Sequence, residues 1–214
     1  MNLLIDTVLV LLILTNLRLI ASSRIASCID VVAIQGILLG VLPLMVGTDH
    51  ITVRACFLSA STILLKGVIF PWLLLRALRA AHIHREMEPL VGYTTSLLIG
   101  ALLLALAMWL GSQLPLPVPA ASPLVVPLAM YNLMIGLFAI VSRRKAITQV
   151  LGYLVMENGI YAFGLAFAMS EPLLVELGIL LDVFMAVFVM GITIFHISRE
   201  FDHMDTDRLT ILKD

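Results

Sequence analysis

The sequence predicts an all-α protein, a polytopic bundle of about seven transmembrane helices. Hydrophobic residues make up 61% of its 214 residues and charged residues 13%, whereas an ordinary soluble domain is about 25% charged. The mean hydropathy is +1.10. Apolar segments recur along the chain, and each is long enough for a helix to cross a hydrocarbon core of about 30 Å. Because these segments lack the short alternating pattern of barrel strands, helices are the structure that the membrane allows.

The apolar segments define the expected spans in order. They cover residues 3–20, 28–47, 52–76, 90–111, 123–141, 148–169 and 173–197. The first is expected to be a retained span rather than a signal peptide, since it has no basic region before it and no small-residue cleavage site. The proline-rich segment 112–122 favours extended backbone and predicts an external linker. It separates a four-span part, 1–111, from a three-span part, 123–197, and a polar tail follows at 198–214.

The positions of Lys and Arg predict the orientation. Eleven basic residues fall in alternate loops and the tail, whereas one, Arg54, falls on the other side. Cytoplasmic loops are enriched in Lys and Arg, so the N-terminus is expected outside and the C-terminal tail in the cytoplasm. The alternation also supports the number of spans, because one wrongly placed span would scramble it downstream.

Several function classes are excluded by composition. The formal net charge of −1 offers nothing to attract nucleic acid. Cys28 and Cys56 lack CxxC spacing and clustered histidines, so the chain has too few ligands for an iron-sulfur cluster or a structural zinc. The spans leave no room for a soluble catalytic domain. We therefore expect a non-catalytic membrane chain that holds no cofactor or metal itself.

Three ionisable residues fall well inside the expected spans: Lys66, Glu157 and Asp182. Each costs roughly 2.5–3.5 kcal/mol at the bilayer centre if unpaired. A rise of about 1.5 Å per helical residue places all of them in the middle third of the membrane. Burial disfavours the charged form of an acid or base, so such groups can accept and release protons. They are the candidate proton relay.

Polar and small residues surround these charges. Tyr153 and Tyr161 lie four residues before and after Glu157, and Asn158 is adjacent to it, so these side chains are auxiliary candidates. Glycines 152, 159 and 164 would let a neighbouring helix approach closely. Ser59, Ser61 and Thr62 precede Lys66, and Pro71 is expected to loosen the helix after it.

Two further residues are auxiliary candidates near the ends of the last span. Glu176 lies one to two turns from Asp182 and could form the outer mouth of a relay, and His196 lies near the opposite boundary. Both positions are also typical of interfacial residues.

A structural alternative remains open beside the relay. Lys66 could pair with Glu157 or with Asp182 simply to fix helix packing, and the sequence does not decide which carboxylate is its partner. A single ion pair would leave the third charge unexplained.

The segment "SRRKAITQVLGYLVMENGIYAFGLAFA" resembles the K subunit of respiratory complex I, in which a basic loop leads into a helix with a buried glutamate. "ELGILLDVFMAVFVMGITIFHI" is similar to that subunit's next helix, with Asp182 at its second buried carboxylate. In one departure, Leu154 takes the place of the first glutamate, and Glu157 follows about one turn later on nearly the same helix face.

The additional N-terminal spans and "LLKGVIFPWLL" around Lys66 resemble more closely the E component of formate hydrogenlyase and hydrogenase-4 complexes. The resemblance implies a multi-pass subunit of a prokaryotic cytoplasmic (inner) membrane, which helps to couple electron transfer to proton or sodium translocation. The implied partners are antiporter-like membrane subunits, a quinone-site-type membrane subunit and a peripheral hydrogenase arm. The nickel-iron centre and the iron-sulfur clusters would lie in those partners.

Two other functions remain open at this point. A small subunit of a multi-subunit cation/proton antiporter also resembles the complex I K subunit and needs no hydrogenase partner. A non-conducting membrane scaffold would use the buried charges only to hold the assembly together.

Overall fold

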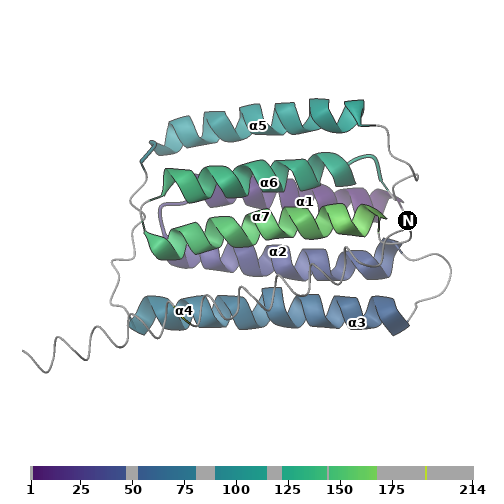
Figure 1. Ribbon diagram of the computed structural model, residues 1–214, viewed down its shortest axis with the longest axis horizontal. Coiled ribbons are helices and arrows are strands. Elements are labelled where there is room, and N and C mark those ends of the chain that lie inside the picture. Colours follow the sequence, from purple (N-terminus) through teal and green to yellow (C-terminus); the bar gives the residue numbers. More distant parts are fainter. Residues whose placement is uncertain are drawn as a thin grey trace, which may run out of the picture.

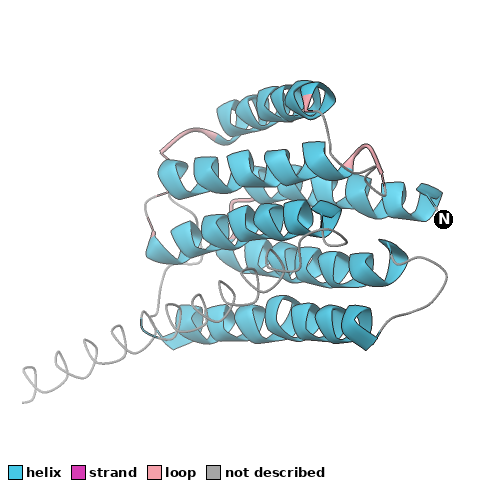
Figure 2. Ribbon diagram, turned by 45° about the vertical axis from the view of Figure 1, so that its right-hand side comes forward, coloured by secondary structure: helices cyan, strands magenta, loops and turns pink. Residues whose placement is uncertain are grey.

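The computed structural model describes residues 2–46, 53–80, 90–114, 122–143 and 145–167, together with Gly191. Regular secondary structure in these ranges is entirely helical. The elements are α1 (Asn2–Ala21), α2 (Ile25–Val46), α3 (Val53–Thr62), the π-helix η1 (Ile63–Ile69), α4 (Phe70–Ala80), α5 (Tyr93–Gln113), α6 (Val125–Ser142) and α7 (Ala146–Phe167). Figures 1 and 2 show a bundle in which these helices run alongside one another.

The helical fold class is confirmed for the described residues. Five helices there are long and apolar enough to cross a membrane: Leu3–Ala21, Ile25–Met45, Ala55–Arg79, Tyr93–Gln113 and Val125–Ser142. α7 has 22 residues and lies within the same bundle (Figure 1). The predicted seventh span, 173–197, and the tail, 198–214, fall outside the described residues apart from Gly191.

The helices are arranged with α5 at one edge and the continuous helix α3–η1–α4 at the other (Figure 1). Between them lie α6, α1, α7 and α2. α2 packs against α1, α3, η1, α4 and α7, and is therefore central to the bundle. α5 is the least buried of the five candidate spans, so its apolar surface is available to lipid or to another subunit.

Basic residues gather at one end of the bundle. α1, α4 and α6 end there, and α2, α5 and α7 begin there, at the left of Figure 1. The cations at this end are Arg18, Arg24, Arg76, Arg79, Arg143 and Lys145. This arrangement agrees with the alternation of basic loops along the sequence. That the basic end of the bundle lies on the cytoplasmic side of the membrane stays a prediction.

Arg143 is not the solvated loop cation that its position in the sequence predicts. Its side chain is buried, and Nη2 donates a hydrogen bond to the carbonyl oxygen of Ile20 at 3.0 Å, in the last turn of α1. Its guanidinium lies 5.8 Å from the ring centroid of Tyr93 at the start of α5. Burial lowers the pKa of this guanidinium. A cation at a helix C-terminus is favourable, so Arg143 ties α1 and α5 to the end of α6.

The third span contains an irregular turn next to Pro71. Proline has no backbone N–H and cannot donate to the carbonyl four residues earlier. Immediately before it the helix widens into η1, and the N–H of Phe70 bonds to the carbonyl oxygen of Leu65, five residues earlier. The expected loosening around Pro71 therefore takes the form of a π-helical segment. Lys66 lies in this segment, which is the kind of irregularity often found at functional sites.

Candidate functional site

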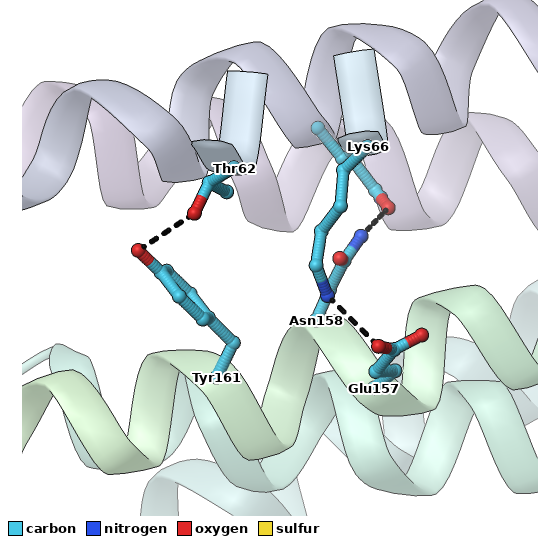
Figure 3. A network of polar contacts seen from close by, with 6 residues as sticks. Thr62, Lys66, Glu157, Asn158 and Tyr161 are labelled. Atoms are coloured by element: carbon cyan, nitrogen blue, oxygen red, sulfur yellow. Dashed lines mark hydrogen bonds and ion pairs between the residues drawn. The ribbon is translucent and has the colours of Figure 1, made fainter. Parts of the chain in front are cut away.

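The centre of the candidate site is a buried ion pair. Nζ of Lys66 lies 3.4 Å from Oε1 of Glu157, and the two side chains are 3% and 1% exposed. Figure 3 shows Lys66 reaching from η1 toward α7, where Glu157 points back at it. Among the described residues, Glu157 is therefore a partner of Lys66, one of the two pairings that the sequence left open. Asp182 lies outside the described residues.

Glycine on α2 makes room for the lysine helix. A methyl group added to Gly36 would lie 2.5 Å from the backbone carbonyl carbon of Lys66. Contacts this short do not occur between real Cβ atoms and backbone, so a side chain at this position would push η1 away. Gly36 therefore sets how close Lys66 lies to the bundle centre.

Glycines also place the helix of the glutamate. A methyl group at Gly159 would lie 2.7 Å from the carbonyl oxygen of Ala129, and one at Gly152 would lie 2.8 Å from the backbone nitrogen of Ile140. On the facing helix, a methyl group at Gly136 would lie 2.5 Å from the backbone nitrogen of Met156. The predicted close approach at Gly152 and Gly159 is thus confirmed, with α6 as the neighbouring helix.

Two hydroxyl groups extend the pair along α3 and α7. Thr62 donates a hydrogen bond from Oγ1 to the phenolic oxygen of Tyr161 at 3.1 Å (Figure 3). The Tyr161 ring centroid lies 5.5 Å from Nζ of Lys66, a distance at which an ammonium is attracted to the ring. Tyr161 therefore contacts both the hydroxyl of Thr62 and the cation of Lys66.

A chain of buried amides extends the site in the other direction. Asn158 donates from Nδ2 to Oε1 of Gln35 at 3.3 Å. Gln35 donates from Nε2 to Oδ1 of Asn16 at 2.8 Å and to Oγ1 of Thr15 at 3.0 Å. Asn16 in turn donates from Nδ2 to Oδ1 of Asn132. This amide chain, Asn158–Gln35–Asn16–Asn132, links α7, α2, α1 and α6 at the level of the ion pair.

The far end of the amide chain carries an unpaired donor. Nδ2 of Asn132 is buried without a hydrogen-bond partner, as is the hydroxyl of the neighbouring Tyr131. Leaving a buried polar group unsatisfied costs about 1–3 kcal/mol. Such groups in a membrane bundle indicate a polar layer rather than an ordinary packed core.

The other predicted residues have different outcomes. Tyr153 is half-buried and packs against the larger hydrophobic cluster, and its auxiliary role stays a prediction. Glu176 and His196 lie outside the described residues, so their auxiliary roles stay predictions. Within the described ranges, no group of three or more His, Cys, Asp and Glu side chains could hold a metal ion.

Sequence reasoning missed Gln35, Asn16 and Asn132. The search for unusual residues in the spans looked for charges, and these side chains are neutral. Yet all three are 0% exposed, and a neutral amide in hydrocarbon also needs partners. A search for Asn and Gln anywhere inside each predicted span would have found them.

Comparison with known proteins identifies the family. Hydrogenase-4 component E of Escherichia coli K12 is 31% identical over 155 residues, which is 72% of this chain and 72% of that protein. This chain belongs to the hydrogenase-4 component E family. The component E of Shigella flexneri matches to the same extent. An uncharacterised protein of Mycobacterium tuberculosis is 32% identical over 204 residues, 95% of this chain and 93% of that protein.

A second family covers the C-terminal part of this component E homologue. Residues 124–214 match the family described as NADH-ubiquinone/plastoquinone oxidoreductase chain 4L. No solved structure gives a significant match. The match includes Glu157, Asn158 and Tyr161 but not Lys66 or Gln35. The site is therefore shared between the chain 4L-like part and the helices that precede it.

Proposed function

We propose that this chain is a membrane subunit of an energy-converting nickel-iron hydrogenase complex of the formate hydrogenlyase type. In this proposal it supplies part of a proton (or sodium) translocation path that is coupled to electron transfer in partner subunits. The observation that carries the proposal is the buried Lys66–Glu157 pair, set in a polar layer that crosses five helices. Membership of the component E family supports the hydrogenase partner over a free-standing antiporter.

The pair can hold one proton in two ways. With the proton on Nζ, Lys66 is an ammonium and Glu157 a carboxylate; with the proton on Oε1, the lysine is an amine and the glutamate a carboxylic acid. Both forms have the same total charge, so the proton can shift without charging the membrane interior. A low-dielectric environment penalises the two ionised groups, and their mutual attraction opposes that penalty. A change in a neighbouring charge would then shift the proton between them.

Asp182 is the proposed second relay group, on the predicted last span. The nickel-iron centre and iron-sulfur clusters belong, in this proposal, to the partner subunits that transfer electrons. The antiporter-like subunits, the quinone-site-type subunit and the hydrogenase arm are the proposed neighbours. The chain itself needs only to hold, orient and exchange protons.

The decisive experiment compares translocation with hydrogen evolution. Inverted membrane vesicles containing the native complex would be assayed for hydrogen gas and for a pH gradient. In Glu157→Gln, translocation per hydrogen molecule should fall about tenfold, as expected when a group that transfers protons is removed. Asp30→Asn, which neutralises an exposed carboxylate on α2, is the control and should translocate normally.

Two outcomes would contradict the proposal. If Glu157→Gln translocates like the unaltered protein, Glu157 is not a relay group. If the purified native complex lacks a nickel-iron large subunit, the chain serves another assembly, such as a cation/proton antiporter. A protonophore and a sodium ionophore, added separately, identify the translocated ion by which of them collapses the gradient.

The orientation is part of the same proposal. We place the basic end of the bundle in the cytoplasm of a prokaryotic cell, the N-terminus outside and seven spans in the cytoplasmic membrane. A reporter that is active only in the cytoplasm, fused after residue 214, should be active. If a reporter that is active only outside the cytoplasm were active at the same position, the proposed orientation would be wrong.

A further inference from the structure

The polar layer around Glu157 has two chemically different halves. On one side are hydroxyl groups of α3 and α7, and on the other are the amides of α7, α2, α1 and α6. Hydroxyl groups and amides differ in what they can do with a proton. A hydroxyl can accept a proton on its lone pair, release its own proton on the other side and then rotate back. A neutral side-chain amide has no such exchange at physiological pH.

The hydroxyl half is a stripe along one helix face. Ser59, Thr62 and Lys66 are spaced three and four residues apart, which places them on one face. All three side chains are buried, with 4%, 3% and 3% exposed. Ala55, four residues before Ser59, continues the face with a small side chain. The stripe runs from the ion pair toward the beginning of α3.

α7 supplies the second side of this stripe. Tyr161 lies one turn beyond Glu157 and accepts a hydrogen bond from Thr62 of the stripe. Because α7 is antiparallel to α6 and ends where α3 begins (Figure 1), Tyr161 also lies on that side of the ion pair. From Lys66 to Ser59 is seven residues, about 10 Å along the axis, and from Ser59 to Val53 is about 9 Å more. The stripe therefore leads from mid-membrane toward the end of the bundle opposite the basic cluster.

The amide half of the polar layer cannot pass protons along in this way. Three of its amides each donate to the next along the chain, and their groups are used by neighbouring protein atoms rather than left for water. A proton that reached Asn158 could not continue through Gln35 and Asn16. This half closes the α1 side of the layer, and its unpaired groups are at its far end, on Asn132 and the neighbouring Tyr131.

We propose that Ser59, Thr62 and Tyr161 form a half-path through which the Lys66–Glu157 pair exchanges protons with the aqueous phase at the end of the bundle where α3 begins. The inference rests on the proposed relay function and gives it a direction. A water molecule between Tyr161 and Lys66 completes the path: it receives a proton from the phenol and passes one of its own to the amine. The phenol regains a proton from Thr62, Thr62 regains one from Ser59 through water, and Ser59 regains one from the aqueous phase. The hydroxyls and the water then end as they began, and the ion pair has gained one proton.

The first test removes single hydroxyls without changing shape. In Thr62→Val and Tyr161→Phe, translocation per hydrogen molecule in vesicles of the native complex should fall about tenfold. Thr148→Val, at a buried hydroxyl, and Tyr93→Phe, at the start of α5, are the matched controls, because both residues lie outside the polar layer. They should translocate like the unaltered protein.

The outcomes separate the half-path from the relay. If Glu157→Gln loses translocation while Thr62→Val and Tyr161→Phe keep it, the half-path is wrong and the relay stands. If Glu157→Gln translocates normally, Glu157 is not a relay group, and both the relay and the half-path that rests on it are wrong. Equal losses in the hydroxyl variants and in the matched controls would also overturn the half-path.

The second test asks directly whether water reaches the stripe. Ser59→Cys and Thr62→Cys would be made in the full complex with Cys28 and Cys56 replaced by Ser, because Cys56 is exposed. A small membrane-impermeant methanethiosulfonate should label both thiols from the face opposite the basic end. Thr15→Cys, on the amide side, should stay unlabelled from either face. Labelling of the stripe only from the basic end, or none at all, would overturn the proposal.

Discussion

The two helices that carry the ion pair are held in the bundle in different ways. The helix of Glu157 packs on α6 through glycines that face backbone: Gly136 meets the nitrogen of Met156 and the carbonyl oxygen of Gly152. The helix of Lys66 packs on α2 partly through side chains, since the nearest atoms to Gly67 are in the side chain and nitrogen of Ile37. Backbone cannot move aside without shifting a whole helix, whereas a side chain can change its rotamer. The contact of the glutamate helix with α6 is therefore rigid, whereas the contact of the lysine helix with α2 is rigid at Gly36 and adjustable at Gly67.

The two helices that carry the ion pair also differ in their regularity. α7 is a continuous α-helix of 22 residues, whereas the helix of Lys66 changes to π geometry over Ile63–Ile69. Of the two helices that carry the pair, only the lysine helix combines a π-helical segment with a contact through a side chain, at Gly67.

The largest effect is expected where backbone meets backbone. Gly136→Ala would place a methyl group 2.5 Å from the backbone nitrogen of Met156, so α6 and α7 must separate. We expect little or no intact complex in detergent extracts, measured by size-exclusion chromatography of the tagged chain. Gly92→Ala, where a methyl group meets nothing within 4 Å, is the control and should assemble normally.

The ion pair should give the next largest effect. Removing one partner of a buried pair leaves an uncompensated charge and costs about 3–5 kcal/mol. Lys66→Met should therefore lower the thermal stability of the complex markedly. The double variant Lys66→Met/Glu157→Gln should recover much of that stability and yet fail to translocate. A double variant that regained translocation would support the scaffold alternative.

The amide chain should contribute less. Gln35→Leu removes the acceptor of Asn158 Nδ2 and the donor to Asn16 Oδ1, and an unsatisfied buried group costs about 1–3 kcal/mol. The expected result is a lower midpoint of thermal unfolding, with hydrogen evolution retained in the complex that survives. Gln113→Leu, an exposed position at the end of α5, provides the comparison. Equal midpoints for the two variants would show that the chain contributes nothing.

The smallest effect is expected at the adjustable contact. Gly67→Ala places a methyl group 2.9 Å from the Cγ1 atom of Ile37, a side chain that can yield. We expect assembly close to that of the unaltered protein, in contrast to Gly136→Ala. If Gly67→Ala abolished assembly as completely, the distinction between a rigid and an adjustable contact would be wrong.

The sequence by itself determined the helical fold class and the buried positions of Lys66 and Glu157. It also determined the five described helices that are long and apolar enough to cross a membrane. It also located the irregularity next to Pro71 and the close contacts of Gly152 and Gly159. These features depend on local composition and on spacing along one helix, which the sequence states directly.

The tertiary structure alone showed that Glu157 faces Lys66, that Gln35, Asn16 and Asn132 join the layer, and that Arg143 is buried. These depend on which helices are neighbours and how each is rotated about its axis. In a chain this apolar, almost every helix face is hydrophobic, so hydropathy gives little information about rotation. The rotation of each helix is fixed by the contacts of its glycines and by the pairing of polar groups between helices. These contacts exist only once the helices have come together.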